Sequence, residues 1–314
     1  MTRAPVRRFA MLLALSLPSC GGDGGATTFL SIGTGGTGGI YYPLGGAIAS
    51  RLSAADTTRT YTAEVTGGSV ENINRVLNGE MDLGFAISPS VYEAYHGGPT
   101  FASADPRLRI VAPLYANVTH ILVSARGSLN DVASFRGRRV SVGSGGSGTE
   151  QVAHHVLEAY GLGADSVSAQ YLSFSESAAA LADGAIDAAI FSVGFPASAA
   201  LEALTTGAAR LLPLSPAAIA AMTAAHPYYT TAEIPAGVYP GVDRPIPTTA
   251  VLNWLVARDD LDDEVVRRVL DLLRDERPAL QRTAEIAGQI DLARLTATPI
   301  PLHPAAAAWL AGPR

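Results

Sequence analysis

The chain has no lysine and a single cysteine, and both shortages limit the chemistry that it can perform. All 22 basic residues among the 314 residues are arginine. Without lysine there is no phosphate-loop lysine and no Schiff-base nucleophile. With Cys20 as the only cysteine, the fold has no internal disulfide.

Charge is also scarce, and no set of side chains suggests catalysis. Charged residues make up 16% of the chain and the net charge is −6, so we expect no nucleic-acid partner. The six histidines show no zinc-ligand spacing, and no acidic pair stands out as an acid and a base. The run at 145–149 lacks the last glycine of G-x-S-x-G. We therefore expect no enzyme, no cofactor and no metal.

The N-terminus is typical of an exported protein. Arginines 3, 7 and 8 precede an apolar run at 9–17 that is too short to cross a bilayer. The sequence Leu-Pro-Ser-Cys-Gly at 17–21 resembles a lipoprotein cleavage box. We predict a signal peptide at 1–20 of the lipoprotein type, a flexible tether at 21–28, and a periplasmic location with a membrane anchor on lipidated Cys20. Cleavage without lipidation is the alternative.

Two pairs of similar stretches indicate that one structural unit is used twice. The stretch Ser-Ile-Gly-Thr-Gly-Gly-Thr-Gly at 31–38 reappears at 141–148 as Ser-Val-Gly-Ser-Gly-Gly-Ser-Gly. A second pair, 78–85 and 183–190, follows in the same order. Each glycine stretch follows an apolar run and precedes a helical pattern, at 40–52 and at 150–160, as in a β-strand, turn and helix.

This arrangement predicts a binding site for an anion. A helix N-terminus leaves backbone N–H groups without partners, and its dipole favours negative charge. Two such units that face each other would form a cleft with N–H groups on both walls. Hydroxyl side chains at the ends of the predicted strands would add polar contacts.

The apolar pattern predicts an α/β fold with mainly parallel sheets. We expect strands at 60–65, 81–87, 108–114, 120–124, 167–172, 185–193 and 251–256. We expect helices from 69 to 77 and at 176–181, 216–225 and 259–274, with Ser69 as the N-cap of the first of these. The remainder of 215–249 is predicted to be irregular. The chain would leave the first lobe near 117 and return near 214, so that 29–117 and 214–314 form lobe I and 118–213 forms lobe II.

Several of these stretches together resemble one family of transport proteins. They are 32–36 with 39–46, 64–73, 79–88, 143–148, His-Pro-Tyr-Tyr at 226–229 with Ile-Pro at 234–235, and Pro-Leu-His-Pro at 301–304. In this order they resemble the TAXI-type solute receptors of TRAP transporters, over about 29–310. The resemblance implies a class II periplasmic-binding-protein fold with a ligand cleft between two lobes. It also implies capture of a small organic anion (a dicarboxylate, a 2-oxo acid or an acidic amino acid such as glutamate) for a TRAP permease driven by an ion gradient. We expect the receptor to be a monomer.

The expected ligand contacts come from both lobes. Backbone amides at 35–37 and 144–149 would hold the anionic group, hydroxyls would add contacts from lobe I, and aromatic rings would cover an apolar part of the ligand. The candidate residues are Gly35, Gly36, Thr37, Tyr41, Thr66, Ser69, Ser88, Tyr115, Ser144, Gly146, Ser147, Gly148, Thr149, Gly194 and Phe195.

Two other functions remain open. The same fold could serve an ABC importer or an exported sensor. Alternatively, Gly33, Gly35 and Gly38 fit G-x-G-x-x-G, with Glu64 at the end of the next strand, as in a nicotinamide-dependent enzyme. Export and the second copy of the glycine stretch both argue against the enzyme.

Overall fold

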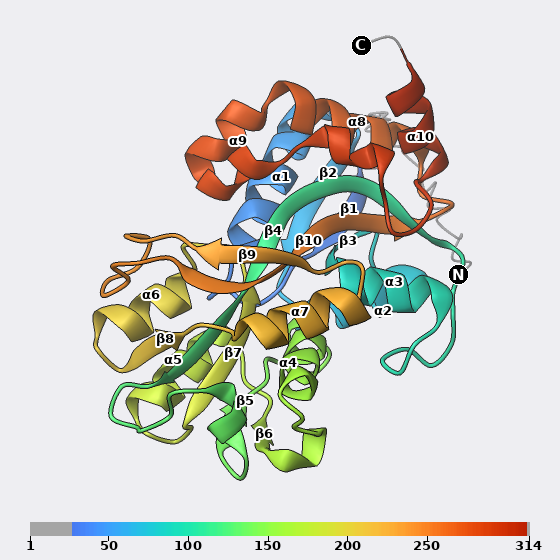
Figure 1. Ribbon diagram of the computed structural model, residues 1–314. Helices are drawn as coiled ribbons and strands as arrows, with labels where there is room; N and C mark the ends of the chain where they lie inside the picture. Colours follow the sequence, from blue (N-terminus) through green and yellow to red (C-terminus); the bar gives the residue numbers. More distant parts are fainter. Residues whose placement is uncertain (1–26, 313–314) are drawn as a thin grey trace, which may run out of the picture.

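The computed structural model describes residues 27–312, in which ten strands form one curled, twisted sheet (Figure 1). The strand order is β2-β1-β3-β10-β4-β7-β5-β6, with β8 beside β4 and β9 beside β10. The predicted signal peptide and Cys20 lie outside the described residues. The sheet runs from one lobe into the other, and helices cover it in both (Figure 1).

The first lobe is built on three parallel strands. In it β1 (Thr28–Gly33) lies between β2 (Arg59–Glu64) and β3 (Leu83–Ile87). The helices that follow these strands are α1 (Tyr41–Ala55), α2 (Ser69–Leu77) and α3 (Ser88–His96). The C-terminal helices of this lobe are α8 (Asp263–Asp275), α9 (Arg277–Thr283) and α10 (Pro304–Ala311), with short 3-10 helices η3 (Glu285–Gln289) and η4 (Leu292–Thr296).

The second lobe repeats this arrangement, as the paired sequence stretches predict. Here β5 (Arg139–Ser141) lies parallel between β6 (Ser168–Gln170) and β7 (Ala188–Val193), as β1 does between β2 and β3. The other elements are η1 (Val132–Phe135), α4 (Gly148–Ala159), η2 (Ala164–Ser166), α5 (Phe174–Ala182), α6 (Ser198–Thr205) and β8 (Ala209–Leu212). The duplicated βα unit is therefore confirmed at the level of strand pairing.

Two long antiparallel strands connect the lobes: β4 (Leu108–Ser124) and β10 (Ile246–Arg258). Strand β4 pairs with β10 up to Val118 and with β7 from Val118 to Val123. The prediction of two separate strands at 108–114 and 120–124 is wrong. Polar residues interrupt the apolar pattern there, but they are buried and paired: Asn117 donates to the Ser192 carbonyl (2.9 Å), and the hydroxyls of Thr119 and Thr249 lie 3.1 Å apart.

The segment at 215–249 contains the predicted helix and one strand that the sequence did not suggest. Helix α7 (Pro216–Ala225) occupies the predicted position, and β9 (Thr230–Ile234) pairs with the first residues of β10. Residues of α7 and Tyr229 belong to the same buried cluster as α4 of the second lobe. The predicted lobe boundaries at 117 and 214 stay predictions, and from this packing we propose that the second crossing falls within β10.

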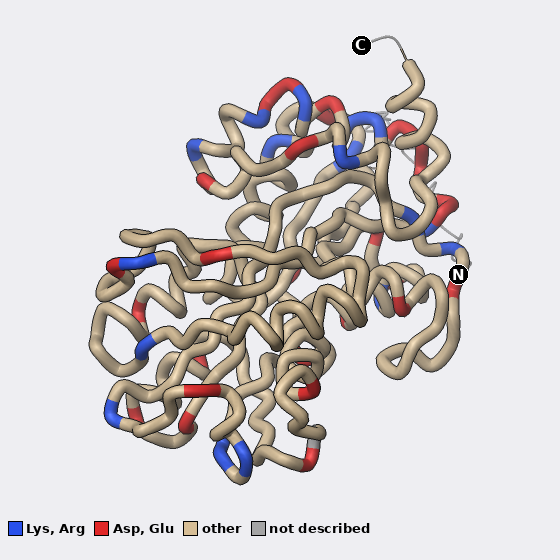
Figure 2. The backbone as a smooth tube through the Cα atoms, in the orientation of Figure 1, with Lys and Arg blue, Asp and Glu red and all other residues tan. Residues whose placement is uncertain are grey.

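The two lobes are closed against each other. The N–H of Glu71 on α2 donates to the Gly146 carbonyl before α4 (3.1 Å), and the Ala199 N–H on α6 donates to the Gly38 carbonyl before α1 (3.3 Å). Charged residues gather over α8 and α9 and around the outer loops, whereas the crossing of β4 and β10 is almost free of them in this view (Figure 2). Between residues 27 and 312, no helix has the length and apolar character needed to cross a membrane.

Candidate functional site

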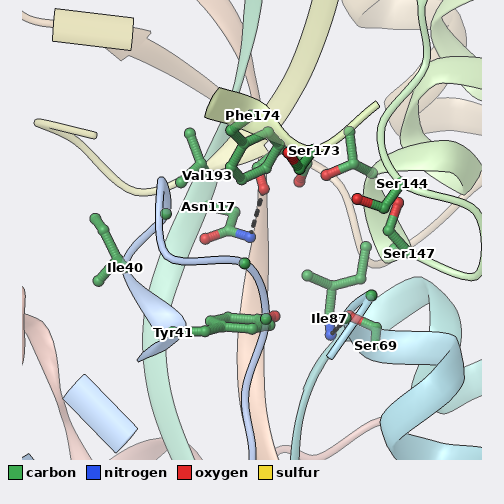
Figure 3. Close-up of a pocket in the computed structure, with 18 of the residues that line it drawn as sticks. Ile40, Tyr41, Ser69, Ile87, Asn117, Ser144, Ser147, Ser173, Phe174 and Val193 are labelled. Atoms are coloured by element: carbon green, nitrogen blue, oxygen red, sulfur yellow. Dashed lines mark hydrogen bonds between the residues drawn. The ribbon is translucent and has the colours of Figure 1, made fainter. Parts of the chain in front are cut away.

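A cavity lies where the closed lobes meet above the crossing strands (Figure 3). It is lined by Gly35, Gly36, Gly39, Ile40, Tyr41, Gly67, Gly68, Ser69, Ile87, Tyr115, Asn117, Ser144, Ser147, Gly148, Thr149, Ser173, Phe174, Ser192 and Val193. The cavity volume, counted as the positions that the centre of a water molecule can occupy, is about 60 Å³. A single water needs about 10–15 Å³ on this measure, so the cavity suits a small molecule.

Four helices begin at this cavity. The lining residues include the caps or first residues of α1, α2, α4 and α5, two helices from each lobe. Figure 3 shows Ser144, Ser147 and Ser173 on one side of the space and Tyr41 and Ser69 on the other. Because each helix N-terminus carries about half a positive charge, all four dipoles favour negative charge in the same place.

The cap of α4 leaves two N–H groups free. Ser147 donates its N–H to the Ser144 carbonyl (3.1 Å), and the Glu150 N–H donates to the Ser147 hydroxyl (3.1 Å). Between them, the N–H groups of Gly148 and Thr149 have no partner among the described residues, and both residues line the cavity. On the opposite wall the same holds for Gly35 and Gly36. Unpaired donors at a helix N-terminus are suited to an anion.

The floor of the cavity is formed by residues of the crossing strands. Asn253 on β10 donates to the Tyr115 carbonyl (2.8 Å) and to the Asn117 side-chain oxygen (2.9 Å), and it accepts a hydrogen bond from the Tyr41 hydroxyl. This network fixes Asn117 and Tyr41. Tyr115 and Ser192 also line the cavity. Their hydroxyl oxygens are buried and have no hydrogen-bond partner among the described residues.

Both tyrosines at the cavity remain protonated. Burial raises the pKa of the Tyr115 hydroxyl well above its usual value, and the neighbouring Tyr41 adds to this shift. Burial also raises the pKa of Tyr41, because desolvation disfavours the phenolate. The Tyr115 hydroxyl is therefore a neutral group.

No residue that lines the cavity carries a charge. Arg75 on α2 is held by Glu64 (2.6 Å) and lies 3.8 Å from Glu71. Glu64, the candidate ribose ligand, is thus in an ion pair away from the cavity. Within residues 27–312 no cluster of three or more His, Cys, Asp or Glu side chains could hold a metal ion. What the site offers is N–H and O–H groups.

The structure brings nine of the predicted ligand-binding residues to one cavity. They are Gly35, Gly36, Tyr41, Ser69, Tyr115, Ser144, Ser147, Gly148 and Thr149. We predicted Ser69 as the N-cap of α2, and this prediction is wrong: Gly68 is the N-cap and Ser69 is the first residue of the helix. The Ser69 hydroxyl instead accepts a hydrogen bond from the Ile87 N–H (3.1 Å). The binding roles of these nine residues remain predictions.

The other six predicted residues do not line the cavity. The Thr66 hydroxyl is 2.7 Å from the Asn72 side-chain oxygen, and the Ser88 hydroxyl donates to the Leu252 carbonyl (3.0 Å). The Gly146 N–H donates to Glu150 (3.0 Å). The remaining three are Thr37, which is exposed, and Gly194 and Phe195, which follow the lining residue Val193.

Among the lining residues that sequence reasoning missed are Asn117, Ser173, Phe174 and Ser192. A signal for Ser173 was present, since Ser173 and Glu176 have capping-box spacing and form that box at the start of α5. The repeat was a second signal, because α5 occupies in the second lobe the position of α2 in the first. Ser192 had no local signal, because it lies within an apolar strand.

The sheet order, the crossing strands and the cavity between the lobes define the two-lobed fold of periplasmic binding proteins, which confirms the predicted fold class. Solved structures of similar fold include a protein of Bordetella bronchiseptica RB50 (18% identity, 87% of this chain and 79% of that chain covered, TM-score 0.55). Another is described as a periplasmic transporter (14% identity, 86% and 89% covered, TM-score 0.53). The alkanesulfonate-binding protein SsuA of Xanthomonas axonopodis pv. citri, bound to MOPS, also matches (19% identity, 85% and 82% covered, TM-score 0.48).

The chain belongs to the NMT1-like family, which matches residues 32–311. This match spans both lobes and the whole cavity. The finer assignment to the TAXI receptors rests on the sequence motifs and remains a prediction.

Proposed function

We propose that this protein is an extracytoplasmic receptor that encloses a small organic anion between its lobes and delivers it to a membrane permease. The observation that carries the proposal is the meeting of four helix N-termini at one cavity between the lobes. The fold and the signal peptide predicted from the sequence are consistent with it.

The cavity can hold an anion without a basic side chain. A charge near a helix N-terminus gains about 0.3–1 kcal/mol at an exposed site and up to about 2 kcal/mol when partly buried. Four such ends, together with the N–H groups of Gly35, Gly36, Gly148 and Thr149, would offset the cost of removing a single negative charge from water. A carboxylate or a sulfonate presents the acceptor oxygens that these donors require.

Two permeases are candidates for the membrane partner. The sequence motifs resemble TAXI receptors, which would pair this protein with a TRAP permease. The alternative is an ABC importer, or a sensor, with the same receptor fold. Uptake of the bound anion into proteoliposomes that contain the permease separates the first two, because an ABC importer needs ATP and a TRAP permease needs an ion gradient. We further propose that the receptor is a monomer anchored through lipidated Cys20.

The hypothesis of a nicotinamide-dependent enzyme has less support than that of a receptor. A dinucleotide is far larger than the cavity, and Glu64, which would hold its ribose, is paired with Arg75. We therefore propose that Gly33, Gly35 and Gly38 shape a receptor loop.

Thermal unfolding of residues 21–314 with a ligand panel tests the proposal. The panel contains carboxylates, sulfonates, amino acids, sugars and NAD. A ligand at 100 times its Kd stabilises by about 2.7 kcal/mol, which shifts the midpoint by several degrees in a protein of this size. A shift with one class of small anion supports the receptor. A shift with NAD alone, or with sugars alone, would overturn it.

A further inference from the structure

We infer that the two glycine stretches, 31–38 and 141–148, form a pair of clasps that hold the lobes closed and thereby set how fast a bound anion leaves. In each clasp, a carbonyl group of one stretch accepts hydrogen bonds from the first turn of a helix in the opposite lobe. The role in release rests on the proposed function. The clasps also give the last glycine of the G-x-G-x-x-G pattern a task apart from ligand contact.

The first clasp joins Gly38 of the first lobe to helix α6 of the second. The Gly38 carbonyl accepts hydrogen bonds from the Ala199 N–H (3.3 Å) and from the Ser198 hydroxyl (3.1 Å). Both donors belong to the first turn of α6, where backbone N–H groups have no partner within the helix. Gly38 is not among the residues that line the cavity, so this clasp is separate from the ligand contacts.

The second clasp repeats the first with the lobes exchanged. The Gly146 carbonyl, in the second lobe, accepts a hydrogen bond from the Glu71 N–H in the first turn of α2 (3.1 Å). Its acceptor lies two residues earlier in the stretch than the acceptor of the first clasp. Each lobe therefore supplies one carbonyl acceptor and one helix N-terminus to the contact between the lobes.

The last glycine of each stretch lets the lobes approach each other. A Cβ atom on Gly38 would lie 2.4 Å from the Ser175 hydroxyl oxygen and 3.3 Å from the Ala199 Cβ, both in the second lobe. A Cβ atom on Gly148, at the same position of the other stretch, would lie 2.6 Å from side-chain carbons of Ile87 in the first lobe. A side chain at either position would press the lobes apart.

The clasps act on the release of the ligand because they exist only in the closed form. When the lobes separate, the same carbonyl and N–H groups turn to water, so each hydrogen bond contributes only a modest net stabilisation. The clasps must break before an enclosed anion can leave, and a weaker clasp should therefore raise the rate of release. The rate of binding depends on the open form and should change little.

Spin labels can report the ratio of closed to open molecules. The fragment 21–314 contains every described residue and no cysteine. Ala54→Cys on α1 and Ala179→Cys on α5 therefore place one label on the exposed surface of each lobe. Double electron–electron resonance gives the distances between the labels without ligand and with pyruvate, 2-oxoglutarate, glutamate or isethionate. Stopped-flow dilution gives the release rate of each anion that binds.

Two variants weaken the first clasp in different ways. Ser198→Ala removes the hydroxyl of an exposed residue and should lower the closed-to-open ratio about 2- to 10-fold. Gly38→Ala adds a methyl group that the closed lobes do not accommodate and should lower the ratio about 5-fold or more. Release should accelerate by similar factors for every anion that binds, whereas a ligand contact would affect the anions differently. The midpoint of thermal unfolding without ligand should change little, whereas a purely structural role would lower it.

The double variant tests whether both changes act on one contact. Because Gly38→Ala already separates the carbonyl from α6, Ser198→Ala should add little to it, and the two factors should not multiply. The matched controls are Ser175→Ala, which removes an exposed hydroxyl from the neighbouring helix α5, and Gly46→Ala, where a Cβ atom would meet nothing within 4 Å. Neither control should change the closed-to-open ratio.

The outcomes separate this inference from the proposed function. Unchanged ratios in both single variants, or factors that multiply in the double variant, would overturn the clasp and leave an anion receptor in place. If the variants reduce the closed form of the ligand-free protein but none of the four anions binds, the clasp is supported and the proposed function is contradicted. A parent protein with no closed population under any of these conditions would overturn both.

Discussion

Substitution of Gly148 by alanine should weaken ligand binding by opposing lobe closure. Gly148 is the first residue of α4 in the second lobe. A Cβ atom there would lie 2.6 Å from two side-chain carbons of Ile87 and 2.7 Å from the Ser69 hydroxyl oxygen, both in the first lobe. Ile87 is 1% exposed and cannot move aside freely. The new methyl group thus collides only when the lobes are closed.

The size of the effect follows from these distances. Non-bonded carbon atoms prefer about 3.5–4.0 Å, so the two lobes would have to separate by about 1 Å at this contact. Overpacking of this kind costs about 1–3 kcal/mol. If only the closed form bears this cost, the Kd rises about 5- to 150-fold. Within α4 itself, alanine is favoured over glycine by up to about 1 kcal/mol, so the second lobe should not be destabilised.

The assay combines affinity, stability and compactness. Titration calorimetry uses the tightest-binding anion of the ligand panel. Thermal unfolding is followed without ligand, and small-angle scattering gives the radius of gyration with and without the anion. The matched control is Gly145→Ala in the same loop, where a Cβ atom would meet nothing within 4 Å. We expect Gly148→Ala to bind weakly, to unfold no earlier than the parent protein, and to contract less with ligand.

Two results would refute this reasoning. If Gly148→Ala binds as tightly as Gly145→Ala, the contact with Ile87 does not limit closure. If it binds weakly but contracts fully at saturating ligand, the methyl group acts on the ligand and not on the lobes.

Three further predictions concern stability. Asn72→Ala should lower the free energy of unfolding by about 2–4 kcal/mol in urea titrations, because the buried Asn72 amide donates to the carbonyls of Thr34 and Phe85 and both hydrogen bonds are lost. An unchanged urea midpoint would contradict this prediction. Ser173→Ala should cost about 1 kcal/mol through loss of the capping box of α5, while Ser173→Asn should restore most of it. Burial lowers the pKa of His120 to about 4, and burial, with help from His226 and His154, lowers that of His155 to about 4. Because the unfolded chain takes up these protons first, near pH 6.5, the full free energy of unfolding is present above that pH and falls as the pH drops toward 4, by up to about 3 kcal/mol per histidine. If the variant His120→Gln folds, its free energy of unfolding should depend less on pH over this range. A free energy of unfolding that stays constant from pH 7 to 4 in the parent protein would refute the assignment.

Much of the fold could be read from local patterns. Helix α8 has an acidic start, with Asp262 as its N-cap, a basic Arg274 in the last turn and an apolar stripe, and its predicted position differs by only a few residues from the observed one. The glycine stretches and the second repeated pair identified the two βα units. These features depend on neighbours in sequence, so the sequence alone reveals them.

The features that the sequence did not reveal depend on contacts between distant residues. The polar run around Asn117 resembles a loop, and only its partners on β7 and β10 make it part of a continuous strand. Thr66 and Ser88 were predicted as ligand contacts because the sequence does not show their hydrogen-bond partners. Their position at a strand end or helix start was right, but their hydroxyls are used by Asn72 and Leu252, which lie on other elements.

The sharing of β4 and β10 between the lobes has a consequence for the history of the chain. The paired βα units suggest that an ancestral half was once duplicated. Yet β4 completes the sheet of the first lobe with its first residues and that of the second lobe with its last ones. A break in the chain that separates the lobes would therefore leave at least one of them without a whole strand. The two halves keep the same pattern of strand pairing, but each completes its sheet with a part of the same strand β4.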